Sequence, residues 1–337
     1  MGEAVVSIGD VAKAAEVSTS TVSYVLSGKR PISKETSDRV HRAIRDLDYR
    51  PNAGARALAG GRTNVIGLVV PLRADLSLPV LMEFAAAVVT RGRQSDYDVL
   101  LLTHEEGVAG LRRVAASSLA DAFIVMDVQA DDPRVPILRA LHVPAVLIGL
   151  PGRPVGLSCV DLDFAASASL LVDHLVELGH RSLALIGSPA AVYDRHTGYA
   201  QRVLSGFDGA AQRAKVTTVW TPCEPSFDGL RRAVADVLAR QPDTTGWLLH
   251  NESVLPSMVA VLQEFGLSVP GDASVVTICP DDMADTHAVA FTNVGLPAND
   301  VGEIAVEMAL RHLEGATAVE TRLLAPVMTE RDSTRHL

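Results

Sequence analysis

Hydroxyl side chains are concentrated between residues 18 and 24 of this 337-residue chain. Val22, Val25 and Leu26 stand three and four positions apart there, so on a helix they would pack inward together. The outward positions would carry Thr19, Ser20, Ser23 and Tyr24. Such a face is poor material for a core, but Ser and Thr can bond base edges or phosphates in a major groove, and a ring can touch a thymine methyl. The alternative is a small helical subdomain with a solvated polar face.

Two short helices with a tight turn between them would position these hydroxyls. Residues 10–15 are mostly small and favour a helix, and Ser18 or Thr19 can cap the helix that follows. Gly28 ends this second helix, as glycine usually does. A third amphipathic helix is predicted over residues 33–47. Its buried stripe would consist of Val40, Ile44 and Leu47.

Several short motifs follow one another through this region at a fixed spacing. They are Asp10-Val11-Ala12, Val17-Ser18, Thr21-Val22-Ser23, Tyr49-Arg50-Pro51-Asn52 and Leu58-Ala59. This run resembles the lac-repressor/galactose-repressor family of bacterial transcription regulators, and the likeness continues more weakly over the rest of the chain. The resemblance implies that the second helix is the DNA recognition helix and that residues 51–60 form a hinge helix.

A hinge of this length is too short to be a stable helix alone, so it should fold when two copies pair over a bent minor groove. Leu58 matches the leucine that wedges into that groove in the family. Tyr24 stands where many members carry Arg, so the usual guanine contact is not implied here. The DNA contacts that the resemblance implies are Ser18, Thr19, Ser20, Thr21, Ser23, Tyr24, Asn52, Ala55, Arg56 and Leu58.

The charge of the chain is divided unequally along its length. The net charge is −10, yet residues 1–62 hold ten Lys and Arg against seven Asp and Glu. The basic end is therefore the nucleic-acid end, and the acidic body would stay off the phosphates. Three scattered cysteines without metal spacing indicate free thiols in a reducing cytosol. No signal-peptide pattern and no bilayer-spanning apolar run occur, so a cytoplasmic protein without membrane contact is expected.

Beyond residue 62, apolar runs alternate with amphipathic stretches. Strands are expected at 65–70, 99–103, 122–126, 145–148, 183–186, 216–220, 247–249, 274–278 and 291–294. Helices are expected at 80–94, 108–118, 135–141, 165–178, 198–213, 228–240, 254–265 and 298–314. Repeated βα units predict an α/β fold with two doubly wound parallel sheets. The resemblance adds that these sheets form a periplasmic-binding-protein-like core of two lobes behind a three-helix helix-turn-helix domain.

The expected domain boundaries combine these patterns with the resemblance. A helix-turn-helix DNA-binding domain covers residues 1–50, and a hinge helix with its linker covers 51–61. An effector-binding and dimerisation core covers 62–337. The family's chain crossings place lobe one at about 62–160 and 291–320, and lobe two at about 161–290 and 321–330.

Polar side chains follow several predicted strands, where doubly wound sheets bind their ligands. A guanidinium, an amide and a carboxylate together suit a polyhydroxylated ligand, and a ring can stack on a sugar face. Arg195 and Arg202 compete for the one arginine position that the resemblance implies. Gly149 stands where sugar-binding members often carry Asp. The candidate effector-binding residues are Phe164, Arg195, Arg202, Asn251 and Asp281.

Motifs for catalysis or cofactor binding are missing from the sequence. No phosphate-binding loop, dinucleotide motif, zinc-protease motif or paired-cysteine spacing occurs, so no catalytic residue, cofactor or metal is expected. Together with the resemblance, this implies a transcription regulator, most simply a repressor, that acts as a homodimer on a palindromic operator in double-stranded DNA. A small-molecule effector, a carbohydrate in the family's usual pattern, would control operator affinity from between the lobes.

Two other classes of protein share this scaffold, a cytoplasmic solute-binding protein and an enzyme. The basic N-terminal domain argues against a solute receptor. Nothing among the motifs recommends an enzyme.

Overall fold

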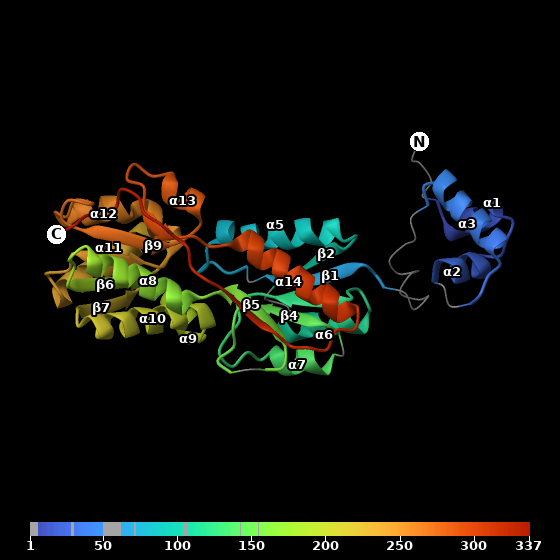
Figure 1. Ribbon diagram of the computed structural model, residues 1–337, viewed down its shortest axis with the longest axis horizontal. Helices are drawn as coiled ribbons and strands as arrows, with labels where there is room; N and C mark the ends of the chain where they lie inside the picture. Colours follow the sequence, from blue (N-terminus) through green and yellow to red (C-terminus); the bar gives the residue numbers. More distant parts are fainter. Residues whose placement is uncertain are drawn as a thin grey trace.

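The computed structural model describes residues 6–27, 30–49, 62–70, 72–103, 107–141, 143–153 and 155–337. Its N-terminal part is a cluster of three helices, α1 (Ile8–Ala14), α2 (Thr19–Ser27) and α3 (Lys34–Asp46) (Figure 1). Ser7 Oγ accepts a hydrogen bond from the Asp10 amide and the Asp10 carboxylate accepts one from the Ser7 amide, so a capping box begins α1. Val11, Val22 and Val40, one from each helix, are fully buried in a shared core. The predicted helix-turn-helix domain is confirmed.

The second helix departs from the expected packing at one position. Val22 is buried and Val25 is partly buried, as predicted, but Leu26 is 37 % exposed. Each residue turns the helix by about 100°. Leu26 therefore lies at the edge of the buried face, whose centre Val22 and Val25 already occupy.

Lobe one contains a six-stranded parallel sheet in the order β11-β5-β4-β3-β1-β2. Every residue of the central strands β3 and β4 is buried, which is typical of parallel strands covered on both faces. Helices α5 (Leu78–Gln94) and α14 (Ala298–Leu313) cover one face, and α6 (Gly107–Ala116) and α7 (Val135–Ala140) cover the other (Figure 1). The strands are β1 (Val65–Val70), β2 (Asp98–Thr103), β3 (Ala122–Val125), β4 (Ala145–Ile148), β5 (Ser158–Leu162) and β11 (Thr321–Leu324).

Lobe two repeats this plan with the order β12-β10-β9-β8-β6-β7, in which only the edge strand β12 is antiparallel. One face packs against α8 (Phe164–Glu177) and α10 (Gly198–Ala214), and the other against α11 (Phe227–Arg240) and α12 (Met258–Glu264). The strands are β6 (Ser182–Gly187), β7 (Thr217–Pro222), β8 (Gly246–Leu249), β9 (Ser274–Ile278), β10 (Thr292–Val294) and β12 (Met328–Thr329). The predicted fold of two doubly wound lobes is confirmed.

Three short helices of lobe two stand outside the main βα repeat. They are α9 (Ala190–Asp194), α13 (Asp281–Asp285) and the 3-10 helix η2 (Glu252–Ser257). The single helix expected over 254–265 is thus divided into η2 and α12. Pro256 explains the division, because it has no N–H to donate to an α-helical hydrogen bond.

The chain passes between the lobes three times, after β5, between β10 and α14, and between β11 and β12 (Figure 1). Strand pairing differs from two of the expected boundaries. Residues 291–294 were expected in lobe one, but Val294 pairs with Ile278 of β9 in lobe two. Residues 321–324 were expected in lobe two, but they form β11 beside β5 in lobe one. The sequence of a short apolar strand does not indicate which sheet it joins. Only its hydrogen-bonded partner strand shows to which lobe it belongs.

Candidate functional site

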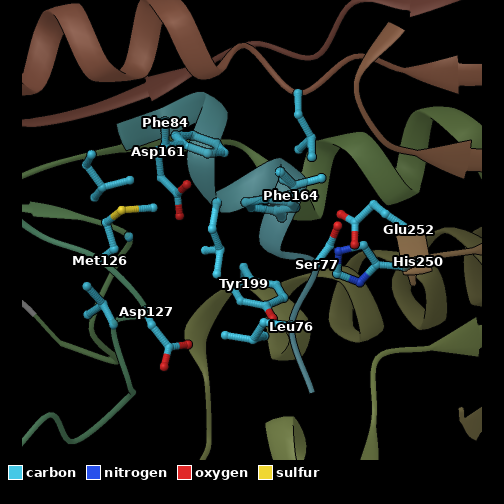
Figure 2. A pocket seen from close by; sticks show the side chains of 16 residues that line it. Leu76, Ser77, Phe84, Met126, Asp127, Asp161, Phe164, Tyr199, His250 and Glu252 are labelled. Atoms are coloured by element: carbon cyan, nitrogen blue, oxygen red, sulfur yellow. The ribbon is translucent and has the colours of Figure 1, made fainter. Parts of the chain in front are cut away.

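A cavity of about 110 Å³ lies between the lobes, at the carboxyl ends of strands from both sheets. A single water needs only about 10–15 Å³, so the space suits a small molecule. Lobe one lines it with Leu76, Ser77, Val80, Leu81, Phe84, Met126, Asp127, Val128, Ile148, Gly149 and Asp161. Lobe two contributes Phe164, Tyr199, His250 and Glu252, and Leu296 comes from the second crossing. Figure 2 shows Met126, Asp127 and Asp161 on one side of the cavity and His250 and Glu252 on the other.

Three rings of lobe two, Phe164, Tyr199 and His250, form one wall of this cavity. Phe164 begins α8, Tyr199 lies in the first turn of α10, and His250 follows β8, so three elements converge. The ring centroids lie 5.7, 5.9 and 5.6 Å apart. Burial lowers the pKa of His250 to about 4 and raises the pKa of Tyr199 well above its usual value. Both rings are therefore uncharged near neutral pH, and the wall offers a ligand a stacking surface.

Three carboxyl groups also face the cavity, from Asp127 after β3, Asp161 in β5 and Glu252 at the start of η2. Arg73 lies 3.4 Å from the Asp127 carboxylate. Arg202 forms an ion pair with Asp161, yet burial raises the pKa of Asp161 against the pull of that guanidinium. Burial also raises the pKa of Glu252 to about 7. Polar groups that can accept hydrogen bonds are thus set into largely apolar walls.

Gly149 accounts for the missing aspartate at the end of β4. Its backbone has φ of +127°, and a Cβ there would lie 2.8 Å from the Val128 Cβ. A side chain at position 149 would therefore be strained and would also collide with its neighbour. Asp127 and Asp161, from the neighbouring strands β3 and β5, supply carboxylates to the same cavity instead.

Of the five expected effector contacts, only Phe164 is among the described residues that line this cavity. Arg202 stands behind the wall, where it pairs with Asp161 and places its guanidinium carbon 5.4 Å from the Phe164 ring centroid. It also donates to the Gly198 carbonyl. Arg202 is therefore a positioning residue for two side chains that reach the cavity.

Asn251 and Asp281 are directed elsewhere. The buried Asn251 amide donates to the Cys223 carbonyl at 2.7 Å, so it fastens two loops of lobe two. The Asp281 side chain is 61 % exposed, lies 3.3 Å from Arg331 and accepts a hydrogen bond from Asn293. Both follow strands as predicted, but neither faces the cavity.

Arg195 connects the two lobes. Its Nη1 lies 2.6 Å from Oδ2 of Asp75, which belongs to the loop between β1 and α5. Arg195 Nε and Nη2 are buried without a hydrogen-bond partner among the described residues. Two backbone hydrogen bonds reinforce the contact, from the Ala130 amide to the His196 carbonyl and from the Gly198 amide to the Val128 carbonyl, each 2.9 Å long.

The sequence reasoning missed most of the cavity. Asp127 stands two residues after β3 and directly after the strand predicted over residues 122–126, so applying the after-strand rule to that strand as well would have found it. Asp161 lies inside β5, which the apolar pattern did not reveal because serine and aspartate interrupt it. His250 and Glu252 flank Asn251, which was selected, and Tyr199 stands three residues before Arg202; only the direction of each side chain shows which of them reaches the cavity.

The N-terminal candidates lie on or beside α2. Ser18, Thr19 and Ser20 are exposed, whereas Thr21, Ser23 and Tyr24 are partly buried. Ser18 Oγ accepts a hydrogen bond from the Thr21 amide at 3.1 Å, so of the two candidate caps, Ser18 and Thr19, it is Ser18 that caps α2. Arg30 lies over the Tyr24 ring at 5.2 Å. The remaining candidates, Asn52, Ala55, Arg56 and Leu58, fall outside the described residues.

Two further properties concern membrane and metal chemistry. No helix in the described part of the chain has the length and apolar character needed to cross a bilayer. Among the same residues, no group of three or more His, Cys, Asp or Glu side chains is arranged to hold a metal ion.

Comparison with known proteins agrees with this architecture. Residues 7–52 match the family of bacterial regulatory proteins, lacI family, and residues 172–334 match the periplasmic binding protein-like domain. Catabolite control protein A of Staphylococcus xylosus is 25 % identical over 95 % of this chain and 96 % of its own length. The transcriptional regulator CelR of Thermobifida fusca is 28 % identical over 93 % of this chain and 94 % of its own.

Solved structures share the whole fold. A complex of the regulator CelR with cellobiose has a TM-score of 0.70 at 25 % identity and covers 97 % of this chain and 99 % of that one. A Lac repressor dimer bound to operator and the anti-inducer ONPF has a TM-score of 0.81 at 23 % identity, with 98 % and 100 % covered. The chain thus joins a DNA-binding unit of the lacI family of bacterial regulatory proteins, at residues 7–52, to a core that contains a periplasmic binding protein-like domain, at residues 172–334.

Proposed function

We propose that the protein is a transcriptional repressor that binds a palindromic operator as a homodimer and releases it when a carbohydrate occupies the cavity between the lobes. The observation that carries this proposal is a set of buried polar atoms at the cavity. Neither oxygen of Asp127, nor Nδ1 of His250, has a hydrogen-bond partner among the described residues. Buried polar atoms are normally satisfied, so these indicate a ligand with several hydrogen-bonding groups, including donors for the Asp127 carboxylate.

The chemistry of the walls favours a neutral saccharide. The Phe164, Tyr199 and His250 rings can pack against the C–H face of a sugar, while Asp127 and Asp161 accept from its hydroxyls. No Lys or Arg is among the described residues that line the cavity, and three carboxyl groups are. A phosphate or carboxylate on the ligand would therefore find no cation in the cavity lining to pair with, because the nearby Arg73 and Arg202 are already paired with Asp127 and Asp161. The cellobiose found in the related CelR complex fits this class of ligand.

The homodimer is supported by an apolar stripe on lobe one. Leu78, Met82 and Val89 of α5 are each exposed by 42 % or more, and Leu101 of the adjacent edge strand β2 is exposed by 43 %. Exposed apolar side chains gathered on one helix and the strand beside it commonly mark an interface between subunits. The Lac repressor neighbour is a dimer on its operator, and a palindrome requires two recognition helices.

Control of operator affinity requires a ligand that binds the two arrangements of the lobes unequally. The cavity is lined from both lobes, so an occupant changes the free energy of their relative orientation. Lobe one carries the chain toward the DNA-binding helices, and a shift between the two copies of lobe one would separate the two DNA-binding units. Leu58 would then lose its place in the minor groove, as the family resemblance implies.

The experiment is fluorescence anisotropy of the full-length protein on DNA from its own upstream region and on scrambled DNA, across a salt series. We expect one dimer per palindrome and a steep salt dependence. Cellobiose, maltose, lactose and glucose are then added in turn, with glucose 6-phosphate as the anionic comparison. Release by a neutral sugar supports the proposal, and equal weak binding to both DNAs contradicts it.

Two substitutions separate the parts of this proposal. Phe164→Ala should abolish sugar-dependent release while operator binding remains, and Phe227→Ala, which alters an exposed ring on α11, is the matched control. Leu58→Ala should weaken operator binding far more than non-specific binding. Equal losses on both DNAs would exclude a wedge role for Leu58.

A further inference from the structure

One carboxylate binds two residues of the segment that enters lobe one, residues 62–64. Asp121 Oδ1 accepts hydrogen bonds from the Thr63 amide and from Thr63 Oγ1, each 2.8 Å long. Asp121 Oδ2 accepts a third, of 2.7 Å, from the Asn64 amide. Thr63 is buried, and Asp121 is partly buried at the start of β3. One side chain thus receives three donors from the two residues that precede β1.

Neighbouring elements hold the same segment from other sides. The Asp98 amide at the start of β2 donates to the Asn64 carbonyl at 2.8 Å, and the Asn64 amide group donates to the Asp96 carbonyl at 3.2 Å. Arg62 donates to the carbonyl of Leu313, the last residue of α14. The segment is therefore fastened to the starts of β2 and β3 and to the end of a helix.

We call the contacts that hold residues 62–64 the anchor. Helix α14 extends from this anchor to the cavity. Leu296, two residues before the helix begins, lines the cavity, and Leu313 at the other end holds Arg62. Sixteen residues of helix span about 24 Å. A Cβ on Gly302, in the second turn of α14, would lie 2.5 Å from the Ala87 Cβ of α5, so the two helices are in close contact. The anchor and the cavity are thus built on the same packed pair of helices.

We infer that the Asp121 carboxylate fixes the direction in which the chain leaves lobe one toward the DNA-binding helices, and so sets the half-site spacing that the dimer accepts. This inference rests on the proposed function as an operator-binding dimer. Two tethered DNA-binding units gain affinity only where their tethers let both bind at once. Rigid attachment at residues 62–64 limits the half-site spacings at which both DNA-binding units can bind at once. Loss of the three hydrogen bonds to Asp121 would allow a wider range of spacings.

The test compares two palindromes selected by the wild-type protein, one with its selected spacing and one with a single base pair inserted at the centre. The insertion moves the half-sites apart by about 3.4 Å and rotates one against the other. We expect the wild-type protein to bind the selected spacing at least about tenfold more tightly. Asp121→Ala should bind the selected spacing about tenfold more weakly and discriminate between the two DNAs by less than about threefold.

Asp131→Ala is the matched control, because Asp131 is also an aspartate of lobe one but is 91 % exposed, with only a 3.9 Å ion pair to Arg153. It should retain the wild-type discrimination. Hydrogen exchange of the Thr63 and Asn64 amides supplies a direct readout, and both should exchange faster in Asp121→Ala alone. Binding to scrambled DNA should be equal in all three proteins.

Retention of the wild-type spacing preference by a folded Asp121→Ala protein overturns the inference. If that variant fails to fold, Thr63→Val removes only the hydroxyl donor, and it should shift the spacing preference in the same direction by a smaller factor. An unchanged preference in Thr63→Val then overturns the inference. A wild-type protein that shows no preference for any palindrome overturns the proposed function, and this inference with it.

Discussion

Arg195 of lobe two and Asp75 of lobe one form an ion pair across the cleft, with 2.6 Å between Nη1 and Oδ2. Both side chains are about one-fifth exposed, so the pair is only partly screened by water. It is a side-chain contact that holds the two lobes together beside the cavity. The lobes are thus in contact through charged groups as well as through the three crossings of the chain.

Asp75→Asn should weaken this contact while keeping the shape of the side chain. A charge-assisted hydrogen bond of this kind contributes about 1.5–3 kcal/mol. We expect the free energy of unfolding in urea to fall by about that amount, and the radius of gyration from X-ray scattering to increase as the cleft opens. Asp131→Asn, which alters the exposed pair with Arg153, should change neither quantity. Equal changes in both quantities for the two variants would contradict a role for Asp75 in holding the lobes together.

Glu252 should make stability depend on pH. Burial, with the like charge of Glu83 nearby, raises its pKa from 4.5 to about 7. The folded protein therefore binds this proton more tightly than the unfolded chain, so the stabilisation is complete below pH 4.5 and is lost as the pH rises through about 7. Glu252→Gln keeps the neutral form at every pH. Its free energy of unfolding relative to wild type should rise between pH 5 and pH 8 by on the order of 1–3 kcal/mol.

The control for Glu252 is Glu264→Gln on α12, where an exposed carboxylate pairs with Arg231. Its stability relative to wild type should not rise over the same pH interval. Urea denaturation at pH 5, 6, 7 and 8 measures both variants. Parallel curves for Glu252→Gln and wild type would show that Glu252 is ionised throughout.

Arg202→Ala should destabilise the fold as well as the ligand site. It leaves the buried Asp161 carboxyl without its guanidinium partner, and breaking a buried ion pair from one side costs about 3–5 kcal/mol. Arg213→Ala removes an exposed arginine from the same helix, 3.9 Å from Asp173, and should cost less than about 0.5 kcal/mol. Urea denaturation distinguishes them. Equal losses of stability would mean that Asp161 does not depend on Arg202.

Ser20→Ala tests the hydroxyl face of α2. Ser20 is exposed, so its removal should leave the melting temperature unchanged. Loss of one hydrogen bond to DNA should weaken operator binding by about 1 kcal/mol, or roughly fivefold. Ser37→Ala on α3 is the control and should bind as wild type does. Anisotropy on the operator measures both, and equal affinities for the two variants would exclude Ser20 from the interface.

The sequence alone determined most of the local elements of this protein. Apolar period and caps located most strands and helices of both lobes to within a few residues, because the burial of a residue such as Val22, or of a strand such as β3, follows from the types of its neighbours in the sequence. The strands β5, β11 and β12 and the short helices α9 and α13 were not predicted. The run of motifs from Asp10 to Leu58 gave the resemblance to the lacI family, whose model matches residues 7–52. Apolar periodicity, caps and motifs depend only on residues that are close in the sequence, so they can be interpreted without knowledge of the fold.

The tertiary structure decided which polar residues meet. Asn251 and Glu252 are adjacent in the chain, yet one amide binds the Cys223 carbonyl and the other side chain faces the cavity. Asp121 reaches residues 63 and 64, almost sixty positions earlier, because β1 and β3 are neighbours in the sheet. The order of strands and the direction of each side chain are set by packing between distant segments. A local sequence pattern does not contain those contacts. The cavity, and the Asp121 contact with residues 63 and 64, could therefore be found only in the folded chain.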